Sequence, residues 1–157
     1  MSERQTAEKR PFFAWVLVVL IFILALGGII SGPMLFLSPD GHLMQWTVDQ
    51  LAGSPFPDYL IPGIILFLFI GVWPLIVGLG LARKMWGAID RLNPFKNYWW
   101  AWTSSLVVGI ILLIWIITET LLLGYISFLQ PLMAAWGLLI LLLALLPAVR
   151  RYYRNPE

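Results

Sequence analysis

The ten Lys and Arg residues of this chain fall into three clusters, and the two stretches between the clusters contain neither residue type. The clusters cover residues 4–10, 83–96 and 150–154. A membrane-spanning helix needs about 20 apolar residues, so each intervening stretch is long enough to cross a bilayer twice. Lys and Arg accumulate in the short cytoplasmic segments of membrane proteins. The pattern therefore predicts two helical hairpins, with both termini and the central loop in the cytoplasm.

The composition agrees with a membrane protein and excludes several kinds of site. Hydrophobic residues make up 61% of the chain, charged residues 11%, and the mean hydropathy is +0.88. A soluble domain of this length would need more polar surface. The absence of cysteine excludes disulfides and thiolate metal sites, and with His42 as the only histidine a bis-histidine haem within one chain is excluded. We therefore expect no cofactor and no metal. The aromatic residues beside the cations fit a headgroup belt rather than a nucleic-acid site.

We predict an all-α fold, an integral membrane four-helix bundle formed by a single domain over residues 1–157. The spans are expected at about residues 12–35, 59–82, 100–124 and 132–149. Residues 83–99 form the predicted cytoplasmic loop. A secretory signal peptide is the alternative interpretation of the first span, but its apolar run exceeds the roughly 7 to 15 residues of a signal core. Pro74 is expected to kink the second span.

Residues 36–58 form a predicted outer cap between spans one and two, with three acidic residues and no Lys or Arg. Residues 38–41 have the composition of a turn. Apolar side chains then recur on one face of residues 42–52, which predicts one short amphipathic helix lying along the outer interface. Asp58 is expected to cap the start of the second span.

Small residues one helical turn apart predict close contacts between helices. Gly28 and Gly32 form such a pair in the first span, and Ser105 and Gly109 form another in the third. The contacts are expected within one chain, and a seam between copies is the alternative.

Glu119 is the one ionisable residue inside a predicted span, and a carboxylate there is costly enough to suggest a role. It either titrates protons or binds a cation, or it hydrogen-bonds the outer loop and holds that loop over the bundle. The predicted topology brings further polar side chains to the same outer face as Glu119: Asp58, Tyr59, His42, Asp40, Tyr125 and Gln130. We expect a polar site there, although no spacing matches a metal-ligand or catalytic motif.

Two outer-face motifs accompany Glu119. Residues 54–63 read SPFPDYLIPG, and residues 129–131 read LQP. With Glu119 they resemble the motifs of a family of small bacterial four-span integral membrane proteins, which is itself uncharacterised. The resemblance implies a protein of the bacterial cell inner membrane and supplies no activity. Similar proteins often carry an acid before the proline of the first turn, where this chain has Ser38.

These features favour a non-enzymatic function, in which the helices and outer cap bind a lipid or another membrane protein. The alternative is a small oligomeric transporter or channel that uses Glu119 as a coupling carboxylate. An enzyme acting on a lipid-soluble substrate ranks third. The expected partners are membrane lipids, another membrane protein or further copies of the chain, and no nucleic acid.

Overall fold

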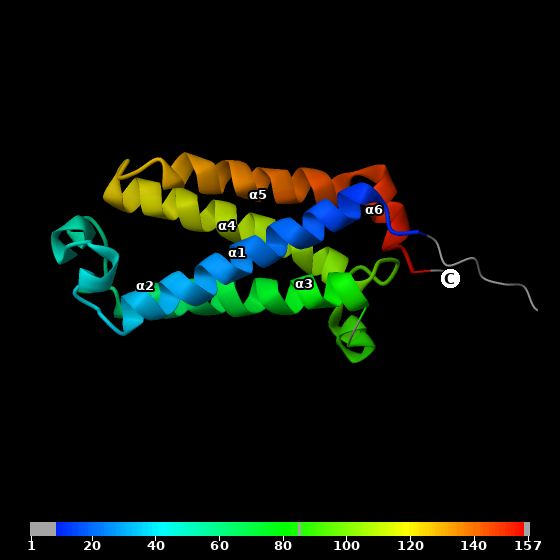
Figure 1. Cartoon of the computed structure of the whole chain (residues 1–157), viewed down its shortest axis with the longest axis horizontal. Coiled ribbons are helices and arrows are strands. Elements are labelled where there is room, and N and C mark those ends of the chain that lie inside the picture. Colours follow the sequence, from blue (N-terminus) through cyan, green and yellow to red (C-terminus); the bar gives the residue numbers. More distant parts are fainter. Residues whose placement is uncertain (1–8, 85, 156–157) are drawn as a thin grey trace, which may run out of the picture.

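The computed structural model describes residues 9–84 and 86–155, and within them the chain folds into helices joined by turns (Figure 1). Three helical segments are long and apolar enough to cross a membrane, judged by length and composition. They are α1 (Phe12–Phe36), the composite segment Leu60–Arg83 and α4 (Trp100–Leu123). A fourth apolar helix, α5 (Leu129–Leu145), has 17 residues. The described residues thus form an all-helical fold with a composition typical of membrane proteins.

The helices pack as two hairpins laid against each other. α4 runs beside α5, and α1 crosses over the composite segment and also contacts α5 (Figure 1). The composite segment closes the bundle by contacting α4. The core of the bundle combines aliphatic side chains such as Leu17, Ile21 and Val108, which are fully buried, with the buried aromatic residues Trp100, Trp102 and Tyr153. The outer surface of the bundle is also largely apolar, because long helices such as α1 and α4 carry apolar side chains on all sides.

The charges separate to the two ends of the bundle. At one end lie the beginning of α1, the turn η4 (Gly87–Leu92) and the last helix, α6 (Pro147–Tyr152) (Figure 1). We call this the basic end, because every described Lys and Arg lies there: Lys9, Arg10, Arg83, Lys84, Arg91, Lys96, Arg150, Arg151 and Arg154. Arg4 falls outside the described residues. The opposite end, here the acidic end, holds residues 36–58 and the connection between α4 and α5, with no described Lys or Arg.

The close contacts predicted at Gly28, Gly32 and Gly109 are present within the chain. A Cβ atom built on Gly28 would lie 2.5 Å from the backbone nitrogen of Gly71, and one on Gly32 would lie 2.6 Å from Cβ of Phe67. Gly109 approaches α5 in the same way, with its built Cβ 3.1 Å from the carbonyl oxygen of Gly137. The absence of side chains at these points is what allows α1 and α4 to approach their neighbours.

The composite segment Leu60–Arg83 is irregular in its middle. It consists of α2 (Leu60–Ile65), a π-helical stretch η3 (Leu66–Val72) and α3 (Trp73–Arg83). Pro74 has no N–H to donate to the carbonyl one turn earlier, so the ordinary hydrogen-bond ladder is interrupted before it. The distortion expected at Pro74 is therefore found on its N-terminal side, as seven residues of wider helix.

The predicted amphipathic helix over residues 42–52 is wrong. The structure has two short 3-10 turns instead, η1 (His42–Met44) and η2 (Val48–Leu51), separated by Gln45 in a left-handed conformation with φ 58°. The Tyr59 hydroxyl donates to the Thr47 carbonyl oxygen at 3.0 Å. A tertiary contact of this kind competes with a continuous helix, and the apolar periodicity of the segment does not reveal it.

The fourth helix differs from the span predicted at about residues 132–149. α5 begins at Leu129 and ends at Leu145, and Leu146 is extended with ψ 134°. Leu146 precedes Pro147, and the residue before a proline is disfavoured in the helical conformation. The chain therefore turns at Leu146, and α6 folds across the basic end, where Tyr98 and Arg154 form an isolated bridge.

Candidate functional site

Glu119 lies near the end of α4 at the acidic end of the bundle. Its Oε2 accepts a hydrogen bond of 3.1 Å from the indole nitrogen of Trp115, one turn earlier on the same helix. The Gln130 side chain lies close to the carboxyl group as a polar neighbour. Glu119 is half-buried, and no Lys or Arg in residues 9–84 and 86–155 pairs with it. A neutral donor, the Trp115 indole, therefore satisfies this carboxylate.

Gln130 links Glu119 to the connection between α4 and α5. Its side chain is only 3% exposed. The amide oxygen accepts from the backbone nitrogen of Ile126 at 2.8 Å, and the amide nitrogen donates to the carbonyl oxygen of Gly124 at 3.0 Å. Gly124 has φ 75°, a conformation that favours glycine. These contacts favour the interpretation in which Glu119 holds the loop over the bundle.

Tyr59 anchors the segment over residues 36–58. Its ring is 3% exposed and packs against Trp46 with 5.6 Å between ring centroids. Its hydroxyl lies 3.2 Å from the Gln50 side-chain oxygen as well as near Thr47. Glu119 is close enough to Tyr59 to act on it electrostatically. The same segment reaches the end of α4, because a Cβ on Gly53 would collide with the Leu122 carbonyl oxygen.

The other residues of the predicted site have local roles. The N-cap of α2 is Tyr59 rather than the predicted Asp58. Asp58 lies one residue earlier, and its Oδ1 accepts a 2.9 Å hydrogen bond from the backbone nitrogen of Leu60. The Ser38 hydroxyl and the backbone N–H of His42 both donate to Asp40 and hold the pKa of that carboxyl below its usual value. His42 is exposed, and Tyr125 is 71% exposed.

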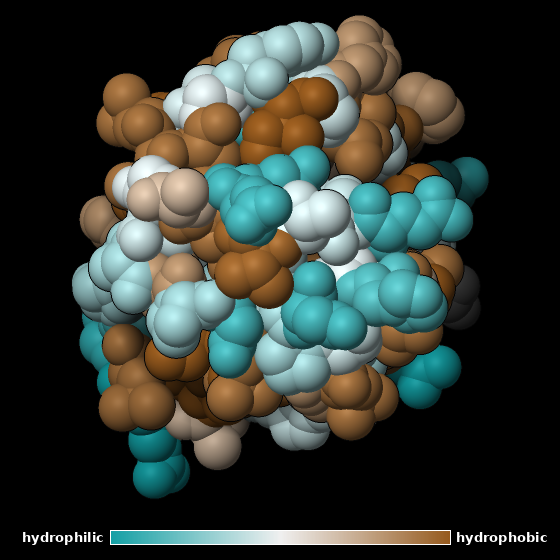
Figure 2. All heavy atoms as spheres, turned by 90° about the vertical axis from the view of Figure 1, so that its left-hand side faces the viewer, coloured by the Kyte–Doolittle hydropathy of each residue, from teal (hydrophilic) through white to brown (hydrophobic). Residues whose placement is uncertain are grey.

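The polar side chains of the acidic end thus spread over it rather than converge. Figure 2, which faces this end, shows hydrophilic residues gathered across its middle with apolar residues around them. Among the described residues no three His, Asp or Glu side chains are placed to hold a metal ion. The structure brings Glu119 together with Gln130 and places Tyr59 nearby. In the described residues, Glu119 forms no hydrogen bond with the remaining residues of the predicted site, which are Asp40, His42, Asp58 and Tyr125.

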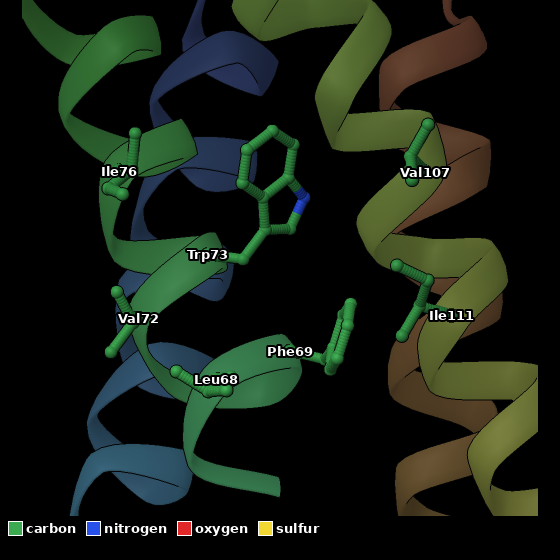
Figure 3. Close-up of a pocket in the computed structure, with 7 residues that line it drawn as sticks. All are labelled: Leu68, Phe69, Val72, Trp73, Ile76, Val107 and Ile111. Atoms are coloured by element: carbon green, nitrogen blue, oxygen red, sulfur yellow. The ribbon is translucent and has the colours of Figure 1, made fainter. Parts of the chain in front are cut away.

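Sequence reasoning missed a groove between the composite segment and α4, at mid-height of the bundle. It has a volume of about 390 Å³ and an almost wholly apolar lining from two helical segments (Figure 3). The lining residues are Leu68, Phe69, Val72, Trp73, Ile76, Val107 and Ile111. One of these residues, Trp73, has an indole nitrogen that is buried and has no hydrogen-bond partner in the described part of the chain. The neighbouring Pro74 was the available signal, since proline and π-helical distortions often accompany functional sites.

At the basic end, side chains tie the ends of the chain to the bundle. Arg10 donates to the carbonyl oxygens of Leu81 and Ala82 at the end of α3, and its guanidinium lies 4.4 Å from the ring centroid of Trp15. The Tyr153 hydroxyl also donates to Leu81, at 3.1 Å, and burial raises the pKa of Tyr153. Contacts of a cation and a hydroxyl with backbone carbonyls therefore stabilise this end of the bundle.

Comparison with protein-family models, with curated proteins and with solved structures finds no match to this chain. The resemblance suggested by the SPFPDYLIPG and LQP motifs therefore stays a prediction, and the site has to be interpreted from its own geometry.

Replacing Glu119 with glutamine tests the role of the carboxylate. An amide can still accept from Trp115, but it loses the stronger charge-assisted bond, so we expect a loss of about 0.5–1.5 kcal/mol in unfolding free energy. Hydrogen exchange at residues 124–130 should rise with it. Tyr125→Phe, at an exposed neighbouring position, is the control and should change neither quantity. Unchanged stability and exchange, together with loss of a pH-dependent cation flux in liposomes, would instead assign Glu119 to transport.

Proposed function

We propose that this chain is a four-span protein of the cell inner membrane that binds a lipid in the groove between its second and third spans and carries out no reaction itself. Both termini and residues 83–99 are cytoplasmic in this proposal. Its orientation rests on the gathering of all described Lys and Arg at the basic end, since positive residues favour the cytoplasmic side. α5 serves as the fourth span, short but able to cross a locally thinned bilayer.

The observation that carries the lipid-binding role is the apolar groove in Figure 3. A groove lined by side chains of one chemical kind, at the depth of the hydrocarbon, selects an equally apolar occupant. Ten residues separate Trp73 from Arg83 at the end of α3, which is about 15 Å along a helix. The hydrocarbon core is about 30 Å thick. The groove therefore opens near the bilayer centre.

The walls of the groove are partly accessible from the side. Leu68, Phe69 and Val107 are each exposed by 41–48% in the isolated chain. In a bilayer this surface meets lipid, so a chain can enter the groove laterally without crossing a polar barrier. The π-helical η3 supplies Leu68, Phe69 and Val72 to the lining. The distorted part of the second span is thus the part that shapes the groove.

A transporter or channel centred on Glu119 is the second candidate. One observation favours it, namely that the half-buried carboxylate has no cationic partner among the described residues. Its hydrogen bond from Trp115 and the polar Gln130 side chain beside it account for the carboxylate without transport, which is why we rank this candidate second.

Filling the groove tests the lipid-binding proposal. Val107→Trp should reduce the lipid retained in native mass spectra at least about tenfold, because the added ring occupies the space of a chain whose burial contributes about 25 cal/mol per Å². Ile117→Trp is the matched control, at another exposed position of α4 that does not line the groove. It should leave lipid retention unchanged. Equal retention by the two variants would contradict the proposal.

A further inference from the structure

The indole N–H of Trp73 differs from those of four other tryptophans in the bundle. The indoles of Trp99, Trp102 and Trp136 donate to backbone carbonyls at 2.9–3.2 Å, and that of Trp115 donates to Glu119. The Trp73 nitrogen is buried without an acceptor. A buried donor left unpaired costs about 1–3 kcal/mol. These four indoles have acceptors in the protein, whereas the Trp73 indole, in the wall of the groove, has none. This difference indicates that the missing acceptor belongs to the molecule that occupies the groove.

The direction of the side chain supports this inference. Figure 3 shows the Trp73 ring projecting from α3 toward α4, with its nitrogen on the side facing α4. The opposite wall offers the hydrocarbon side chains of Val107 and Ile111, which accept no hydrogen bond. The backbone carbonyls of α4 at that level are engaged within the helix. The described residues place no acceptor within hydrogen-bond distance of the Trp73 nitrogen, so that acceptor is assigned to the ligand.

The depth of Trp73 restricts the chemistry of that ligand. Trp73 lies about 15 Å from the end of α3 and about 20 Å from Leu60 at the start of α2. The ester carbonyls of a glycerophospholipid stay at the boundary of the hydrocarbon core, about 15 Å from its centre. A carboxylate or phosphate at the centre would cost several kcal/mol. What remains is a neutral lipid whose acceptor oxygen resides within the hydrocarbon.

We propose that the groove binds a neutral lipid bearing a ring carbonyl, of the isoprenoid quinone class, and that the Trp73 indole N–H donates to that carbonyl. The inference rests on the proposed lipid-binding function and names its ligand. The apolar lining accommodates the tail, and the single donor orients the head. The proposal is one of binding alone.

The test pairs two ligands with two forms of the protein. The probes are an alkyl-tailed benzoquinone and the alkylbenzene with the same tail, titrated into nanodiscs that hold the full chain. Trp73→Phe keeps an aromatic ring and removes the N–H. We expect it to weaken benzoquinone binding about five- to tenfold, as the loss of one hydrogen bond implies. Alkylbenzene binding should be unchanged, which also shows that the groove has kept its shape.

Trp115→Phe is the matched control, because it removes an indole N–H that is already paired outside the groove. It should leave both affinities unchanged. Equal weakening of the two ligands by Trp73→Phe, or no benzoquinone binding by a protein that retains another lipid, would overturn the quinone proposal and leave lipid binding intact. Failure of Val107→Trp to displace any ligand would overturn the lipid-binding proposal itself. A dimer that Val107→Trp disrupts would assign the groove to a second copy and overturn both.

Discussion

Replacing Gly28 with alanine is expected to lower the free energy of unfolding by about 2–3 kcal/mol, the upper part of the range for overpacking a buried contact. The new Cβ would lie 2.5 Å from the Gly71 nitrogen and 2.5 Å from the Ile70 carbonyl carbon. These are backbone atoms, which cannot move aside as a flexible side chain would. α1 and η3 would have to separate along a contact that also includes Gly32.

The neighbouring glycine supplies a matched control. A Cβ on Gly27 meets no atom within 4 Å. Gly27→Ala should therefore raise stability by up to about 1 kcal/mol, because alanine is the better helix former. Unfolding in detergent, followed by circular dichroism, gives both values. Equal effects of the two substitutions would contradict the packing of α1 against η3 described above.

Asp90→Ala is expected to lower the free energy of unfolding by about 2–4 kcal/mol, combining the loss of a helix cap with the loss of hydrogen bonds to a charged acceptor. Asp90 Oδ1 accepts from the backbone nitrogen of Trp100, the first residue of α4, at 2.9 Å, and from Asn93 at 3.3 Å. Its Oδ2 accepts from Asn155 at 3.3 Å. One carboxylate thus joins η4, α4 and the C-terminal segment.

Asp49→Ala is the control for this prediction, since Asp49 is an exposed acid at the other end of the bundle with no side-chain hydrogen bond in the described residues. It should change stability by no more than about 0.5 kcal/mol. Thermal unfolding with limited proteolysis of residues 150–155 separates a loosened C-terminal segment from global unfolding. An Asp90→Ala variant as stable as Asp49→Ala would show that the three contacts contribute nothing.

The two longest helices could be located from sequence because their ends are marked chemically. α1 starts directly after Pro11, and α4 stops at Gly124, whose positive φ ends the helix. The predicted end of the fourth helix is wrong because the prediction followed the hydrophobic run, which continues past Pro147. In this case the local effect of proline outweighed composition. A sequence window averages over that effect.

The site was harder to predict for a different reason. The sequence identifies Glu119 as an unusual carboxylate. Its contact with Gln130, however, depends on how α4 and α5 pack against each other. The groove depends on the distance in space between α4 and the composite segment. Along the sequence, these two segments are separated by the loop at the basic end. Periodicity describes the faces of one helix at a time. It predicts neither that Val107 lies opposite Trp73 nor that one indole lacks an acceptor.

Photocrosslinking from within the groove tests lipid binding most directly. A photoreactive amino acid placed at Val107, and in a second protein at Ile117, would be activated in native membranes and the lipid adducts weighed. Ile117 is 57% exposed and does not line the groove, so it reports the surrounding bilayer. We predict one dominant adduct at Val107, with a mass that is minor at Ile117. The same mixture of bulk lipids at both positions would contradict a specific lipid site between the composite segment and α4.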